Sequence, residues 1–354
     1  RDRLIKIAEA ILRHPAREPI VSLMLQRPDA LSKKRLKQRI GISKKSPAPE
    51  VIIGPTSANH YGRLRMISEY WRFNLQPATC NLQLMNPYHR PAWIEISLTQ
   101  LQKNFELINQ DKPEPLSILY VVKDQAYGHG AVQCAQVALQ NGVNMVGVAT
   151  IGEAVELREK GIVAPILVFG ERLENQMEFC LRYDLVICIN TVQKARTYAT
   201  YAEKWQKTPE VHIEIDTGLH RYGIRWTEAV KVVKQIWSLS GIRIKGIMSH
   251  FAMSDELDKS YAYEQLRRFR MVLDGLDQYG IRIPLKHMCN TGGFLDIPSA
   301  HFDMVRLGIL PMGVFPSKVC RRIPEIQPIM SVKAKIVETR NLLPDDKVGY
   351  GMHY

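Results

Sequence analysis

The chain has 354 residues, of which 45% are hydrophobic, and it carries a formal net charge of +13. No apolar run approaches the ~18 residues that a membrane-spanning helix needs, so we expect a cytoplasmic protein without a membrane segment. The six cysteines are scattered and form no Cys-x-x-Cys pair. This pattern argues against a zinc site and against a disulfide-rich secreted domain.

The positive charge is concentrated in the N-terminal quarter. Residues 1–90 hold 17 Lys and Arg against 6 Asp and Glu, a net of +11, and residues 91–354 hold the other 31 and 29, a net of +2. We expect residues 1–90 to be a basic extension of uncertain structure or part of an upstream region. The alternative is a nucleic-acid-binding arm, which requires retention on RNA or DNA that weakens steeply with salt. We do not expect nucleic acid to be the partner.

From Pro91 onward, predicted strands alternate with predicted helices. A strand at 92–97 leads into a helix at 98–109 that Ser97 caps. Eight further apolar segments indicate buried strands, at 116–122, 144–149, 164–169, 184–189, 210–215, 244–249, 287–290 and 304–308. This alternation predicts parallel strands with right-handed crossovers, and about eight units predict an α/β protein with a (β/α)₈ TIM-like barrel over residues 91–320. A doubly wound sheet is the alternative, but no Gly-x-Gly-x-x-Gly motif supports it.

Beyond Pro316 the pattern changes to β-structure. Residues 329–338 alternate between apolar and polar side chains, as a half-exposed strand does. We therefore expect residues 321–354 to begin an antiparallel β domain that this chain does not complete. The chain begins with Arg1 rather than Met, so we expect a piece of a longer protein that is poorly stable or inactive by itself.

Polar side chains at the ends of the predicted strands indicate a single site. Lys123 ends the first apolar run, where a partly desolvated lysine can attack a carbonyl group; a lysine that simply reaches solvent is the alternative. The other strand-end residues are Asp216, Arg221, Ser249, His250, Asn290, Thr291 and Arg306. Together they favour an anionic, phosphate-bearing cofactor held through an imine, with glycines such as Gly308 freeing backbone N–H groups for the phosphate.

Six motifs in this order resemble those of the alanine racemase family, which consists of pyridoxal-phosphate-dependent enzymes with a fold-type III barrel. The motifs are VKDQAYGHG at 122–130, IDTGLHRYG at 215–223, SHFA at 249–252, CNT at 289–291, VRLGI at 305–309 and VGYG at 348–351. The resemblance extends from about Ala92 to Tyr354 and implies that the chain is C-terminally truncated relative to the family.

The resemblance also implies roles for individual residues. Lys123 would hold the cofactor and act as one catalytic base, and Tyr350 would be the opposite base, supplied by the other subunit of a homodimer. Arg306 would face the pyridine nitrogen, with His250 between that arginine and Tyr350. Arg221 would contact the substrate carboxylate. The cofactor phosphate would be bound by Tyr127, Thr291, Gly308 and Ile309.

Two departures from the family pattern accompany these roles. Glu214 stands where many relatives carry a lysine that becomes carbamylated, and its carboxylate would supply the same negative charge to position Arg221. Asp124 and Gln125 replace the usual Ala-Asn after the lysine.

The implied activity is racemisation of L-alanine and D-alanine, which supplies D-alanine for bacterial peptidoglycan. Two bases on opposite faces of Cα exchange its proton, and pyridoxal 5'-phosphate acts as an electron sink. The alternatives are a racemase of broader specificity or for serine, and a non-catalytic pyridoxal-phosphate-binding barrel protein. The motif around Tyr350 argues against the non-catalytic protein.

Overall fold

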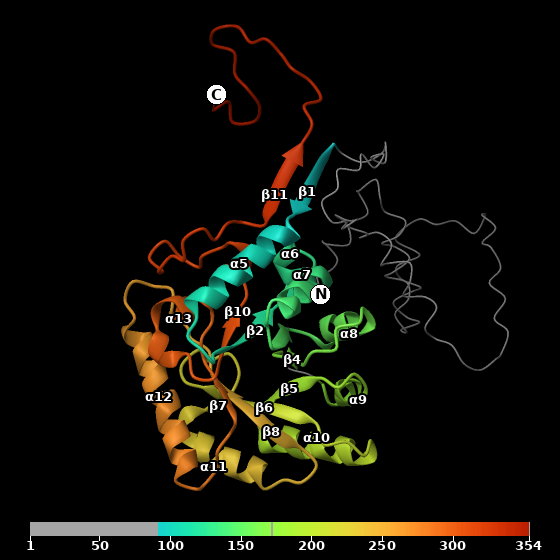
Figure 1. Cartoon of the computed structure of the whole chain (residues 1–354), viewed down its shortest axis with the longest axis vertical. Coiled ribbons are helices and arrows are strands. Elements are labelled where there is room, and N and C mark those ends of the chain that lie inside the picture. Colours follow the sequence, from blue (N-terminus) through green and yellow to red (C-terminus); the bar gives the residue numbers. More distant parts are fainter. Residues whose placement is uncertain (1–90, 171–172, 354) are drawn as a thin grey trace, which may run out of the picture. The chain divides into compact units, whose positions relative to one another are not determined.

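The computed structural model describes residues 91–170 and 173–353, and in them eight parallel strands form a nearly closed barrel (Figure 1). In spatial order these strands are β10 (Met304–Leu307), β2 (Ser117–Val121), β3 (Met145–Val148), β4 (Ile166–Val168), β5 (Val186–Ile189), β6 (Glu210–Asp216), β8 (Arg243–Met248) and β9 (Leu285–His287). Backbone hydrogen bonds from Asp303 N to Lys286 O (3.1 Å) and from Arg306 N to Cys289 O (2.9 Å) join β9 to β10. The predicted (β/α)₈ barrel is therefore confirmed.

The strands are buried on both faces, which explains why their sequences are continuous apolar runs. One set of side chains fills the barrel interior, namely Leu119, Met145, Leu167, Val186, Cys188, Met248 and Met304. Side chains on the other face pack against the surrounding helices in a larger cluster. A rigid, close-packed barrel of this kind fixes where each strand ends, and hence where the polar residues after the strands lie.

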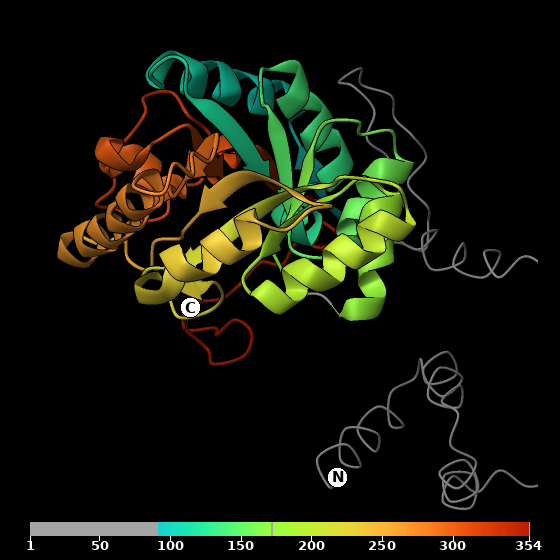
Figure 2. The same cartoon turned by 90° about the horizontal axis from the view of Figure 1, so that it is seen from below.

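Helices surround the barrel on its outside (Figure 2). They are α5 (Leu98–Asp111), α6 (Lys123–Gly128), α7 (Ala131–Gln140), α8 (Ile151–Glu159), α9 (Met177–Arg182), α10 (Val192–Lys204), α11 (Trp226–Trp237), α12 (Ser260–Asp277) and α13 (Thr291–Asp296), with 3₁₀ turns η2 (Glu174–Gln176), η3 (Pro298–Ala300) and η4 (Leu310–Met312). Helix α5 begins as predicted, because the Ser97 hydroxyl accepts the Gln100 N–H. Its apolar residues recur at helical spacing and are fully buried, namely Leu101, Phe105 and Ile108.

The strand predicted at 92–97 does not join the barrel. Strand β1 (Ala92–Ile96) instead pairs antiparallel with β11 (Met330–Ala334), with Ala92 opposite Ala334. Figure 1 shows this two-stranded sheet beyond one end of α5. The predicted antiparallel segment after the barrel is thus confirmed, although its strand ends at Ala334 rather than continuing to residue 338.

Two further details of the barrel differ from the prediction. Strand β9 spans Leu285–His287, so it begins two residues before the expected segment 287–290, and Met288 and Cys289 lie after its end. The short strand β7 (Ile224–Arg225), which pairs with β6, was not expected.

The predicted domain boundaries at residues 90 and 320 stay a prediction, and the basic extension 1–90 lies outside the described residues. Within the part that the structure describes, no helix is long and apolar enough to cross a membrane.

Candidate active site

Lys123 follows strand β2 and begins α6, whose residues form a left-handed turn rather than a right-handed helix. Residues Asp124 to Tyr127 all have φ between 52° and 55°, a conformation that costs roughly 1–2 kcal/mol for each non-glycine residue. Such a turn persists only where neighbouring groups hold it. The Lys123 side chain is 39% exposed, and its Nζ lies 3.7 Å from Asp124 Oδ2 and 5.7 Å from the centre of the Tyr127 ring. The amine is therefore accessible at the C-terminal rim of the barrel.

Arg306 is the buried cation of the site. It lies on β10, where Nη1 contacts His287 Nδ1 at 3.0 Å and Nη2 contacts His250 Nδ1 at 2.9 Å. Nη2 also donates to the carbonyl oxygens of Ser249 (2.7 Å) and Met288 (3.0 Å). Burial lowers the pKa of Arg306 to about 10, so the guanidinium stays charged at neutral pH. Because a guanidinium only donates hydrogen bonds, both histidines accept through Nδ1.

The histidines around Arg306 are held neutral. Burial, followed by the charges of Arg306, Arg221 and Lys123, lowers the pKa of His250 to about 3. Burial, followed by His212 and Arg306, lowers the pKa of His287 well below its usual range. A neutral His287 that accepts at Nδ1 carries its proton on Nε2, from which it donates to His212 Nδ1 at 2.9 Å. Arg306 therefore orders a row of neutral imidazoles.

Sequence reasoning did not identify His212 and His287. Both are fully buried in strands, on β6 and β9. The signal that could have found them is a titratable side chain inside an otherwise apolar strand, since a buried polar group is more informative than a buried apolar one. Burial lowers the pKa of His212 to about 3, and its Nε2 is buried without a hydrogen-bond partner among the described residues.

Tyr127 and Gly308 meet at the rim beside Lys123. A Cβ atom on Gly308 would lie 2.6 Å from Tyr127 Oη, so only glycine allows this approach. Burial and the Asp124 carboxylate raise the pKa of Tyr127 to about 12, which keeps the phenol protonated and able to donate a hydrogen bond. Ile309 is half-buried, and its carbonyl accepts from Met312 and Val314.

Thr291 is buried at the start of α13. The preceding residue, Asn290, accepts the Gly293 N–H at 3.0 Å and the Ser254 hydroxyl at 2.6 Å. These two bonds fix the backbone that carries the Thr291 hydroxyl after strand β9.

Glu214 and Arg221 come from β6 and the loop after it. Glu214 is buried, and its negative charge raises the pKa of Arg306. Arg221 is exposed, and its positive charge contributes to the low pKa of His250. Asp216 shapes the loop between them by accepting the backbone N–H groups of Gly218 and His220, both at 3.0 Å.

The comparisons with known proteins agree on one family. The family model described as "Alanine racemase, N-terminal domain" matches residues 96–316. Over 265 residues the chain is 40% identical to an alanine racemase of Halothermothrix orenii, and the match covers 75% of this chain and 70% of that relative. The chain belongs to the alanine racemase family.

Solved structures of the alanine racemase family show the same fold. The alanine racemase of Clostridium difficile 630 matches with a TM-score of 0.71 and 32% identity, over 75% of this chain and 70% of that one. The Bacillus anthracis enzyme with bound L-Ala-P matches with a TM-score of 0.68 and 29% identity, over 76% and 70%.

Tyr350 is the predicted site residue that does not lie with the others at the barrel rim. It lies after β11 on the C-terminal segment, and its side chain is fully exposed, so it contacts none of the groups around Lys123. The other nine predicted site residues of this alanine racemase family member lie on, or within a few residues of, the ends of β2, β6, β8, β9 and β10.

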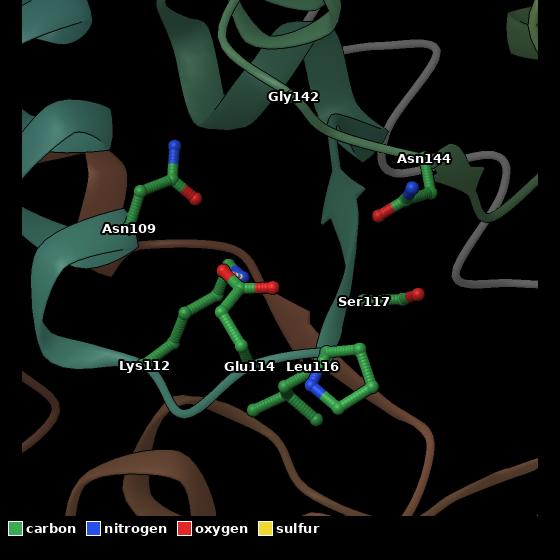
Figure 3. Close-up of a pocket in the computed structure, with 8 residues that line it drawn as sticks. Asn109, Lys112, Glu114, Leu116, Ser117, Gly142 and Asn144 are labelled. Carbon is green, nitrogen blue, oxygen red and sulfur yellow. Dashed lines mark hydrogen bonds and ion pairs between the residues drawn. The ribbon is translucent and has the colours of Figure 1, made fainter.

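The opposite end of β2 carries a pocket of a different kind (Figure 3). Several of its polar groups already have partners within the protein, since Lys112 Nζ pairs with Glu114 Oε1 at 2.5 Å and Asn144 Oδ1 accepts the Ile118 N–H at 3.1 Å. Ser117 starts β2 at this end, whereas Lys123 follows the other end of the strand. Polar groups at the N-terminal face of such a barrel serve stability rather than chemistry.

Proposed function

We propose that the chain racemises alanine with pyridoxal 5'-phosphate as its cofactor, acting in the cytoplasm as a homodimer and supplying D-alanine for peptidoglycan. The observation that carries the proposal is the position of an accessible lysine amine, Lys123, at the same barrel rim as the buried Arg306, which is charged at neutral pH. Membership of the alanine racemase family supports the proposal.

The residues at the rim fit this cofactor. The Lys123 amine is exposed enough to bond to its carbonyl carbon, and the protonated phenol of Tyr127 beside Gly308 suits a phosphate group. Thr291 adds a hydroxyl, and Ile309 follows Gly308 along the same backbone. When bound, pyridoxal phosphate draws electrons from Cα of the attached amino acid and so stabilises the carbanion.

Arg306 would face the ring nitrogen of the cofactor. Because its guanidinium keeps its charge at neutral pH, it donates a hydrogen bond without giving up a proton. Arg306 would thereby leave the ring nitrogen without a proton of its own and limit how much negative charge the ring could accept. This restraint favours return of the proton to Cα over side reactions such as transamination.

Racemisation requires bases on both faces of Cα. We assign Lys123 to one face and the partner subunit's Tyr350 to the other, since Tyr350 is fully exposed in its own chain and therefore available to a second one. His250 accepts from Arg306 at Nδ1, so its remaining proton on Nε2 is available to orient that phenol.

Arg221 and Glu214 would handle the substrate carboxylate. Arg221 is exposed and its charge reaches His250, which places a cation near the proposed reaction centre. The buried Glu214 supplies the counter-charge that orients it, without the carbon dioxide chemistry of a carbamylated lysine.

One assay tests the function and the shared site together. The sequence alone suggested a piece that is inactive by itself, but the chain carries both proposed bases, Lys123 and Tyr350. The unmodified chain, loaded with pyridoxal phosphate, should therefore convert L-alanine to D-alanine, while Lys123→Ala and Tyr350→Phe each lose at least about a hundredfold in rate. A mixture of the two variants should regain about a quarter of the activity, because half of the dimers then hold one intact site of two. Absence of racemisation by the unmodified chain would refute the function. A mixture that regains no racemase activity would refute the shared site.

A further inference from the structure

Two glutamates of α8 hold the left-handed turn that begins at Lys123, hereafter the Lys123 turn (Lys123–Gly128). Glu153 Oε1 accepts the backbone N–H of Asp124 at 2.6 Å. Glu156 Oε2 accepts the side-chain N–H of Gln125 at 2.8 Å. Residues three apart share one face of a helix, so α8 presents both carboxylates to the turn.

Glu153 also binds the end of the neighbouring strand. Its second oxygen, Oε2, accepts the backbone N–H groups of Ala149 at 2.9 Å and Thr150 at 2.8 Å. The Thr150 hydroxyl accepts the Glu153 N–H at 3.3 Å, which completes a capping box at the start of α8. One carboxylate thus joins the residue after Lys123 to the end of β3.

The chemistry of the contact requires a carboxylate. Backbone N–H groups approach both oxygens of Glu153, and only an ionised carboxylate accepts on both sides. Such charge-assisted bonds are short and strong. The left-handed backbone of the Lys123 turn is strained, so its persistence depends on contacts of this kind.

We propose that Glu153 is a positioning residue for Lys123, whose carboxylate locks the Lys123 turn and thereby fixes where the amine lies at the barrel rim. The inference rests on the proposed role of Lys123 in binding the cofactor. Gln125 provides a second tie, because its side chain also accepts the Ala131 N–H, at 3.4 Å, while donating to Glu156. This tie is specific to a chain with glutamine at position 125.

Hydrogen exchange on the cofactor-free 354-residue chain tests the lock directly. Glu153→Gln should speed exchange of the turn amides, residues 124–128, by about tenfold or more, since an amide serves only one of the two sides. The matched control is Thr150→Ala, which removes the other half of the capping box and leaves the Asp124 contact in place. Thr150→Ala should loosen the start of α8 and leave exchange in the Lys123 turn unchanged.

The kinetic readout separates positioning from general stability. With pyridoxal phosphate bound, Glu153→Gln should lower kcat by about tenfold or more, because a displaced base loses the reacting geometry, and should leave the KM for alanine nearly unchanged. Thr150→Ala should retain the parent kcat. Gln125→Ala, a substitution at an exposed residue that leaves α8 intact, should also speed exchange of the turn amides and lower kcat, each by a smaller factor than Glu153→Gln.

The outcomes distinguish the two proposals. Equal hydrogen exchange of the turn amides in Glu153→Gln, Thr150→Ala and the parent would overturn the lock. Should Glu153→Gln fail to fold, unaltered exchange of these amides in Gln125→Ala would overturn it as well. If the parent chain shows no racemisation, the proposed function fails, and the exchange data still decide whether Glu153 holds the turn.

Discussion

At the scale of single residues, the site is organised around one buried charge. Arg306 donates to His287 and His250, and its charge, added to burial, keeps both imidazoles neutral. The polar residues at the ends of β2, β6, β8, β9 and β10 were predictable, because a buried apolar run that stops at a polar or charged residue marks a strand end. The row from Arg306 to His212 was not predictable, because its members come from three strands and their tautomers depend on contacts between them.

Glu214 provides a prediction at this scale. Glu214→Gln should raise the KM for alanine by roughly tenfold, about 1.4 kcal/mol of substrate binding, because the proposed orientation of Arg221 by the Glu214 charge is then lost. Steady-state kinetics with each enantiomer measures the change. The control is Glu210→Gln on the same strand, where the carboxylate pairs with Arg243 at 2.6 Å and KM should not move. Unchanged KM values in both variants would remove the assigned role of Glu214.

At the scale of elements, strand alternation was sufficient to predict the barrel, since parallel strands buried on both faces read as apolar runs. The pairing of β1 with β11 was not predictable, because the two strands are more than 230 residues apart and each alternates in the same way. The left-handed conformation of the Lys123 turn was also not predictable from the sequence. Four consecutive non-glycine residues in a left-handed conformation contradict local preference, so contacts with other parts of the fold, including those with α8, must hold them.

The close approach of Gly308 to Tyr127 leads to a prediction about these elements. Gly308→Ala places a Cβ 2.6 Å from Tyr127 Oη, which must displace the phenol. The dissociation constant for pyridoxal phosphate should rise by about tenfold, the loss of one good hydrogen bond to a charged group. Titration of the cofactor-free protein measures it, with Gly152→Ala as control, where the nearest atom lies 3.9 Å away. Equal affinities in the two variants would show that Tyr127 does not bind the phosphate.

At the scale of the whole molecule, the buried histidines make stability depend on pH. The folded pKa of His212, about 3, lies below the ordinary value of 6.5. Below pH 6.5 the unfolded chain therefore binds a proton that the folded chain does not. The contribution of His212 to the free energy of unfolding is fully present above pH 6.5. It falls as the pH drops from 6.5 towards 3, by up to about 1.4 kcal/mol per pH unit.

Urea unfolding between pH 5 and 8 tests this dependence. The parent chain should lose stability below pH 6.5, and His212→Gln, whose side-chain oxygen can still accept from His287, should show a slope shallower by about 1 kcal/mol per pH unit. Above pH 7 the free energy of unfolding should change with pH in the same way in both chains. Identical slopes between pH 5 and 6.5 would mean that His212 is not held neutral in the folded state.

The most direct test of two-base racemisation is deuterium incorporation at Cα. L-alanine is incubated in D₂O with the chain and pyridoxal phosphate, and both enantiomers are analysed early in the reaction. If Lys123 and the partner subunit's Tyr350 act on opposite faces as proposed, D-alanine should carry deuterium at Cα while the remaining L-alanine keeps most of its protium. D-alanine that retains the original protium, or no D-alanine at all, would contradict the account.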